Sequence, residues 1–149
     1  MLRTASLEEG DEAHLLELAG PGQRLAVRHG VYVEVLGNGF PFLPQEPEWL
    51  PLEMNDGRTV PSVRVLGAVD VAVSKLNRFH ANDRADIDAL IQAELVTHAA
   101  FVRRFLGAVD VRSHDARADE LPLIVRRFHT VERDMFACPP TEVELPGWI

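Results

Sequence analysis

Residues 66–91 read LGAVDVAVSKLNRFHANDRADIDALI, and the spacing of apolar side chains changes within this stretch. Before it, apolar and polar residues alternate as in a strand, whereas from Val69 onward apolar residues recur at helical spacing. The apolar residues of this first helix are Val69, Ala72, Val73 and Leu76. Asn82 or Asp83 can cap a second helix, because a short polar side chain accepts a hydrogen bond from the first turn. The apolar residues of this second helix are Ile87, Leu90, Ile91 and Leu95.

Two β-hairpins are predicted upstream of these helices. The segments LPLEM and VPSVRV, near residues 50–54 and 60–65, flank Asn55-Asp56-Gly57-Arg58, and Asp-Gly tolerates the positive φ of a tight turn. The segment at 24–36, RLAVRHGVYVEVL, alternates apolar and polar residues on both sides of His29-Gly30. Between the hairpins, residues 37–51 hold four prolines and two glycines, which favours an ordered loop over a regular element.

The rest of the chain is predicted to be mostly helical. Helices are expected at residues 7–19, 97–106 and 120–136, followed by an extended tail at 138–149. We expect a single domain over residues 1–149, in which 1–65 form a helix and two hairpins and 66–137 form the helical part. The fold class is then α+β, with a small, mostly antiparallel sheet between Leu25 and Val65 and a helical C-terminal half.

Composition limits the classes of partner. A net charge of −8, from 23 acidic residues against 15 Lys and Arg, argues against free duplex DNA. The single cysteine, Cys138, cannot form an intramolecular disulfide, which suits a reducing compartment. No segment approaches the roughly 20 apolar residues that a membrane span requires. We therefore expect a soluble, cytoplasmic protein without a membrane partner.

Charged residues crowd around the turn between the two helices of the quoted stretch. They are Lys75, Arg78, Asp83, Arg84 and Asp86. Lys75 lies near the end of one helix, and Asp83 and Asp86 lie three residues apart in the first turn of the next, so we expect these three side chains to meet. Such a cluster can be a salt-bridged helix–loop–helix with a structural role, or it can be a binding site. The pairs Arg103-Arg104 and Arg126-Arg127 are expected to flank buried helix faces with their charges in water.

The quoted stretch resembles a pattern of bacterial nucleotidyltransferase-like proteins, including the abortive-infection toxin family and related uncharacterised families. In them a strand leads into a short helix with Ser-Lys-Leu, matched here by Ser74-Lys75-Leu76, and a second helix begins with Arg-Asp-x-x-Asp-Ile. Asp83, Asp86 and Ile87 match that second motif, whereas Asn82 stands where the family has arginine. Upstream, VYVEVL resembles the strand that bears the third metal carboxylate of the family, which places that role on Glu34.

The resemblance implies a nucleoside triphosphate as ligand and Mg²⁺ as cofactor if the protein is active. It assigns catalytic roles to Lys75, Asp83 and Asp86, and nucleotide binding to Lys75, Arg78 and Arg84. The family's Gly-Ser turn and Asp-x-Asp strand have no counterpart, so Glu34 would need carboxylates from a missing segment or a partner chain to hold the metal.

Two functions stay open at this stage. One is a nucleotidyltransferase-like protein, of toxin–antitoxin or phage-defence type. The other is a non-catalytic binding or interaction module derived from that fold, in which Glu34 is a solvent-facing acid on a half-exposed sheet. In either case the loss of the family's first strands leaves an unpaired sheet edge, which favours a homodimer.

Overall fold

The computed structural model of the chain describes residues 9–29, 41–53 and 59–148. The chain divides into two compact units, one within residues 3–40 and one that comprises residues 41–149 together with residues 1–2. The described residues of the larger unit have an α+β architecture, with a two-stranded antiparallel sheet and four α-helices. The coarse fold class predicted from the sequence is therefore confirmed.

The smaller unit contains two helices, α1 (Glu9–Ala19) and α2 (Arg24–His29). They are joined at Gly20, where a side chain would collide with the carbonyl oxygen of Leu16 that accepts the Gly20 amide hydrogen bond. Gly22 follows with a φ of +80°, a conformation that glycine adopts without strain. The predicted helix ending at residue 19 is confirmed over its described part.

The predicted first hairpin is wrong where the structure describes it. Residues 24–29 form a helix, and the amide of Val27 donates to the carbonyl of Gln23 at 3.0 Å. Alternation over so few residues does not distinguish a strand from one and a half turns of helix. The second half of that hairpin, which includes Glu34, lies outside the described residues.

The second hairpin is confirmed. Strand β1 (Trp49–Glu53) pairs antiparallel with β2 (Thr59–Leu66), with Trp49 opposite Leu66. The register shifts between Pro51 and Leu52, as expected where proline removes a ladder donor. The loop predicted for 37–51 is thus shorter, because Trp49 to Pro51 belong to the strand, while residues 41–48 form no helix or strand.

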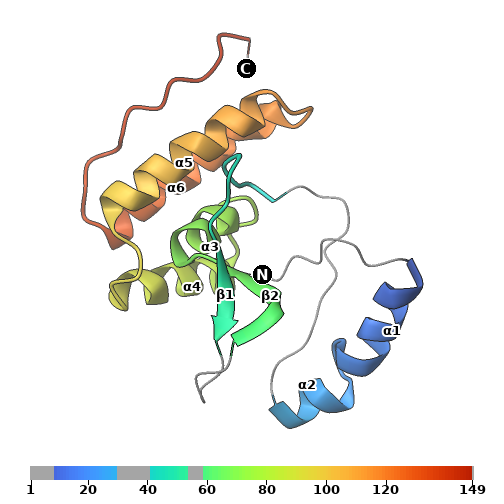
Figure 1. The fold of residues 1–149 in the computed structure, drawn as a ribbon. Coiled ribbons are helices and arrows are strands. Elements are labelled where there is room, and N and C mark those ends of the chain that lie inside the picture. The colour runs from blue at the N-terminus through green and yellow to red at the C-terminus, as the bar shows by residue number, and fades with distance from the viewer. Residues whose placement is uncertain (1–8, 30–40, 54–58, 149) are drawn as a thin grey trace. The chain divides into compact units, whose positions relative to one another are not determined.

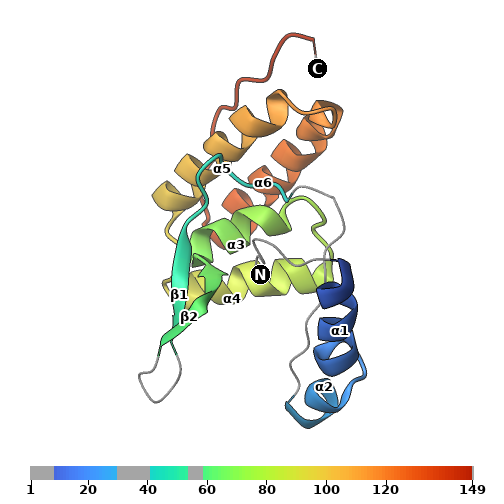
Figure 2. The same ribbon diagram turned by 45° about the vertical axis from the view of Figure 1, so that its right-hand side comes forward.

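The helical part of the larger unit is close to the prediction. Its helices are α3 (Ala68–Lys75), α4 (Ala81–Gln92), α5 (His98–Ser113) and α6 (Leu121–Met135), with a short 3₁₀ turn η1 (Ala118–Glu120) before α6. Figures 1 and 2 show α5 and α6 side by side, with α3 and α4 against them and the hairpin beside α3. Helix α5 extends seven residues past the predicted end at 106, whereas α4 ends at Gln92, so that Leu95 is exposed.

Aromatic side chains form the centre of the core. The rings of Phe105 and Phe128 stack with centroids 3.8 Å apart, and Phe101 packs against Phe128 at 5.5 Å. Phe42, from the loop before β1, contacts Phe105 at 5.7 Å. Each of these rings is fully buried, and burial of one such side chain stabilises a fold by about 1.5–3 kcal/mol. This core fixes the helices that carry the charged cluster.

Candidate functional site

The predicted cluster lies where α3 ends and α4 begins. The chain reverses through Asn77 to Phe79, and Phe79 has a φ of 58°, in the left-handed region. Helix α4 is capped at His80, whose amide donates to Asp83 Oδ2 at 3.0 Å. The predicted cap at Asn82 or Asp83 is therefore wrong by two or three residues, because Asp83 acts from the third helical position rather than from the cap itself.

Asp83 is the buried centre of the cluster, with 2% of its side chain exposed. Arg78 donates to both of its oxygens, from Nε at 2.9 Å and from Nη2 at 2.8 Å, and Lys75 Nζ lies 3.6 Å from Oδ1. The hydrogen bond from Arg78, opposed by burial and assisted by the His80 amide and both cations, lowers the pKa of Asp83 to about 2. Asp83 is thus an anion at any physiological pH.

Lys75 joins Asp83 to the more exposed Asp86. Its Nζ donates to Asp86 Oδ2 at 2.6 Å, and 22% of the lysine side chain is exposed against 56% for Asp86. The structure therefore brings Lys75, Asp83 and Asp86 together, as predicted from their spacing. Lys75 is also the single lysine of the chain. Its side chain is partly exposed, and two carboxylates lie close to its Nζ.

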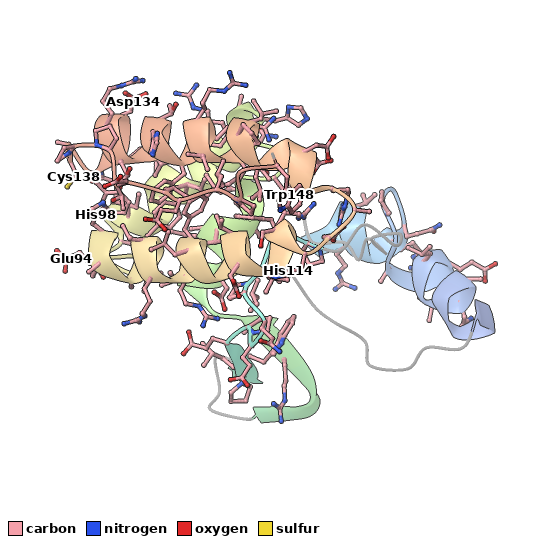
Figure 3. The ribbon with its side chains drawn as sticks, turned by 90° about the horizontal axis from the view of Figure 1, so that it is seen from above. Glu94, His98, His114, Asp134, Cys138 and Trp148 are labelled. Carbon is pink, nitrogen blue, oxygen red and sulfur yellow. The ribbon has the colours of Figure 1, made fainter. Side chains whose placement is uncertain are left out.

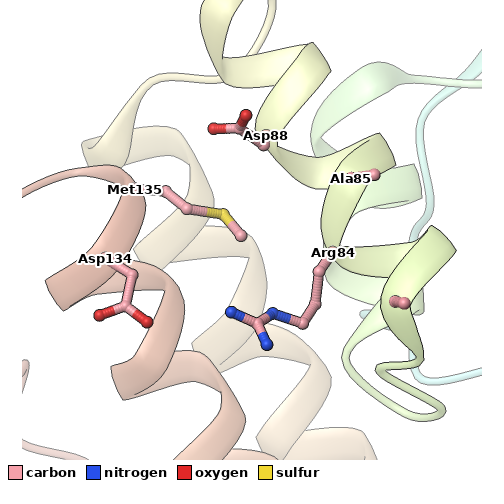
Figure 4. Close-up of a pocket in the computed structure, with 6 residues that line it drawn as sticks. Arg84, Ala85, Asp88, Asp134 and Met135 are labelled. Atoms are coloured by element: carbon pink, nitrogen blue, oxygen red, sulfur yellow. The ribbon is translucent and has the colours of Figure 1, made fainter.

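Arg84 does not belong to this cluster. It lies on the opposite side of α4, where its guanidinium sits 5.6 Å from the centre of the Phe79 ring. There it lines an open pocket of about 410 Å³ between α4 and the end of α6, shown in Figure 4. The pocket is lined by Ala81, Arg84, Ala85, Asp88, Asp134 and Met135. Arg84 thus lies apart from Lys75, Asp83 and Asp86, and its nucleotide-binding role stays a prediction.

The carboxylates of the cluster do not fit a magnesium site. Asp83 accepts from Arg78 and from the His80 amide, and Asp86 accepts from Lys75, so both acids are engaged by hydrogen-bond donors rather than facing a shared vacant position. Among the described residues, no group of three His, Cys, Asp or Glu could hold a metal ion. Glu34, the predicted metal ligand, lies outside the described residues, so its role stays a prediction.

Sequence reasoning missed a buried ion pair at the start of α3. Asp70, in the first turn of α3, accepts from Arg104 Nε at 2.6 Å and Nη2 at 2.5 Å and from the Glu48 amide at 2.6 Å. Arg104 also donates to the carbonyl of Glu46 at 2.8 Å, so one side chain ties α5 to α3 and to the loop before β1. The expectation that the charge of Arg104 lies in water is wrong. The partners are 34 residues apart, and the sequence holds no local signal that pairs them.

Arg127 was likewise expected to keep its charge in water, and it binds main chain instead. Its Nη1 donates to the carbonyls of Leu76 at 3.0 Å and Asn77 at 2.5 Å. These are carbonyls at the end of α3, where helices leave acceptors unpaired. Arg127 therefore fixes the turn that carries Arg78, and indirectly the position of the cluster.

Comparisons with known proteins leave the family open. No protein-family model matches the chain, and neither the curated proteins nor the solved structures that were compared gave a significant match. The resemblance to nucleotidyltransferase-like proteins therefore stays a prediction. In the part of the chain that the structure describes, no helix is long and apolar enough to cross a membrane.

Proposed function

We propose that this chain is a nucleotidyltransferase-like protein in which Lys75 binds the phosphates of a nucleoside triphosphate. The observation that carries the proposal is the placement of Lys75, whose side chain is partly exposed and whose Nζ lies 2.6 Å from Asp86 and 3.6 Å from Asp83. A lysine held by carboxylates but open to solvent can exchange one of them for a phosphate oxygen, which is also an anionic acceptor.

The other members of the cluster have distinct roles in this proposal. Asp83, buried and ionised, positions Lys75 and Arg78. Asp86 is the counter-ion that the triphosphate displaces, because it is the more exposed of the two acids. The resemblance adds the toxin–antitoxin or phage-defence context. It also adds Mg²⁺, for which Glu34 and carboxylates of a missing segment or partner chain would be the ligands.

The single lysine allows a direct test. Reductive methylation with ¹³C-formaldehyde labels Lys75 and the N-terminal amine, whose NMR signals differ because one is a side-chain amine and the other a main-chain amine. Titration with a nucleoside triphosphate and Mg²⁺ should shift the Lys75 signal, and calorimetry on unlabelled protein should detect heat that is lost in Lys75→Ala. Arg103→Ala removes an exposed cation from α5 and should bind as the unaltered protein does.

Asp86→Asn sharpens this test. If the triphosphate replaces Asp86 at Lys75, removing the competing charge should leave affinity unchanged or raise it, whereas a carboxylate that contacts the ligand itself should be needed for binding. Absence of heat and of any shift at millimolar nucleotide would contradict the proposal.

A non-catalytic interaction module is the second candidate, and one observation favours it. Arg78 and Lys75 are balanced by Asp83 and Asp86, and their contacts hold the end of α3 against the start of α4. In that case the cluster is structural. Lys75→Ala would then lower the melting temperature without changing any response to nucleotide.

A further inference from the structure

Glu132 of α6 carries a fully buried carboxylate. Its hydrogen-bond partners are His98 and Thr141, and it is not among the residues that line the pocket of Figure 4. Its Oε2 accepts from the amide of Thr141 at 2.9 Å, and its Oε1 accepts from the Thr141 hydroxyl at 2.5 Å. The Oε1 atom also lies 2.9 Å from His98 Nε2 of α5. A buried carboxylate is costly unless such donors surround it, so this one depends on a residue of the tail.

The tail is held at Thr141 through three groups of this residue, its main-chain amide, its hydroxyl and its main-chain carbonyl. Besides the two bonds to Glu132, its carbonyl lies 3.0 Å from Nε2 of His129, one helical turn before Glu132. Closer to the helix, the Cys138 amide donates to the main-chain carbonyl of Glu132 at 3.0 Å. The chain leaves α6 through Ala137, whose φ of 52° turns it back along the helix.

Residues beyond Thr141 continue the attachment through apolar contacts. Thr141, Val143 and Leu145 are half-buried, whereas Glu142 and Glu144 between them are exposed, the alternation of an extended chain lying on a surface. Val143 and Leu145 pack against the hydrophobic core. Figure 3, seen from above, shows the chain running from Cys138 along α5 and α6 toward Trp148.

We infer that residues 138–148 are a strap that opens and closes as one unit, with the Glu132 carboxylate as its latch and the core surface beneath Val143 and Leu145 as its seat. The helices keep their own core of stacked phenylalanines when the strap leaves, so opening is a local event rather than global unfolding. Burial raises the pKa of Glu132, but the donors on Thr141 and His98 outweigh it and hold that pKa below its ordinary value. The closed strap therefore favours the charged latch.

Amide hydrogen exchange tests this inference. Glu132→Gln replaces one acceptor oxygen by a donor group, and Thr141→Val removes one donor while the threonine's shape is kept. In both variants we expect the main-chain amide of residue 141 to exchange at least about tenfold faster, because a hydrogen bond to a charged group is lost from the closed state. Amides of Phe128 and Val131 in α6 should exchange as in the unaltered protein. Glu142→Gln changes the neighbouring exposed acid and should have no effect.

The milder Thr141→Val keeps the test decisive if Glu132→Gln fails to fold. An unchanged exchange rate of the residue 141 amide in Thr141→Val would overturn the inference. Acceleration of the α6 amides by the same factor would also overturn it, because the tail would then open only with the whole unit. Trp148 gives a second readout, since Trp49→Phe leaves it as the single tryptophan. The fluorescence anisotropy of Trp148, measured on the nanosecond timescale, should fall in Glu132→Gln and in Thr141→Val. It should stay the same in Glu142→Gln.

Discussion

Three buried carboxylates, Asp70, Asp83 and Glu132, each bring together groups from more than one element of the larger unit. Asp70 accepts hydrogen bonds from Arg104 and from the Glu48 amide. Asp83 accepts hydrogen bonds from Arg78 and from the His80 amide. Glu132 is hydrogen-bonded to Thr141 and to His98. Burial of a charge is tolerated here because each acid has several donors. Removing one of these donors, or the acid itself, should consequently lower the free energy of unfolding more than the same change at an exposed ion pair.

Asp83→Asn should lower the free energy of unfolding in a pH-dependent way. The folded-state pKa of Asp83 is lowered from 3.8 to about 2, so its contribution is present above pH 3.8 and is lost as pH falls toward 2. At neutral pH we expect a loss of roughly 1–2 kcal/mol in urea unfolding, because much of the shift comes from the exposed Arg78. The difference between the two proteins should shrink at acidic pH.

Asp86→Asn is the control for this pH series. Asp86 is 56% exposed, so we expect a loss below about 1 kcal/mol at neutral pH. A stability difference for Asp83→Asn that stays constant down to the pKa of the folded state would show that the charge of Asp83 does not stabilise the fold.

At the scale of elements, apolar spacing predicted the helices of 66–91 well and their ends poorly. The end of α4 has no glycine or proline to mark it. Instead Glu94 adopts a φ of 59°, its amide donates to the Ile91 carbonyl and the Leu95 amide donates to the Leu90 carbonyl, which is the Schellman arrangement. Leu95 therefore leaves the helix, although its spacing predicts a place on the apolar face.

Gly107 shows the opposite error at α5. A glycine near residue 106 favours a helix end, yet α5 continues to Ser113. A side chain at 107 would approach Pro44 to 3.2 Å, so the glycine permits close packing of the loop before β1. A sequence shows that a glycine is present, but not whether a turn or a neighbouring segment requires it.

Glu94→Gly should raise the free energy of unfolding by about 1 kcal/mol. The left-handed conformation costs a residue with a side chain roughly this much, and glycine adopts it freely. Ala93→Gly is the matched control one residue earlier, where φ is −79°. There glycine gains nothing in conformation and lowers helix propensity, so thermal unfolding should shift down rather than up. Equal shifts in both variants would contradict the proposed strain at Glu94.

At the scale of the whole molecule, the predictable contacts were the local ones. Lys75, Asp83 and Asp86 lie within 11 residues, and helical spacing was sufficient to bring them together. The contacts of Arg104 with Asp70 and of Arg127 with Leu76 span 34 and 51 residues, and these depend on how helices pack, which the spacing of one helix does not specify. The meeting of Lys75, Asp83 and Asp86 was accordingly predictable, whereas the contacts of Arg104 and Arg127 were not.

The prediction of a homodimer belongs to this scale. In the described residues, β1 and β2 pair only with each other, so each strand has one edge that no other described strand covers. Leu50 in β1 is 44% exposed, and a charged side chain there should oppose pairing between edges. We expect light scattering to show a dimer at high micromolar concentration and a shift toward monomer in Leu50→Lys.

The variant Leu123→Lys distinguishes a dimer that forms through the sheet edge from a dimer that forms through a helix face. Leu123 lies in α6 and is 43% exposed, almost the same as Leu50, so the two substitutions add equal charge at equally accessible apolar positions. If the copies associate through β1, Leu123→Lys should remain dimeric with unchanged circular dichroism. If instead Leu123→Lys dissociates the dimer and Leu50→Lys does not, the helical face is the interface. A monodisperse monomer at every concentration would contradict the dimer itself, and the unpaired edges would then be tolerated because the sheet is short.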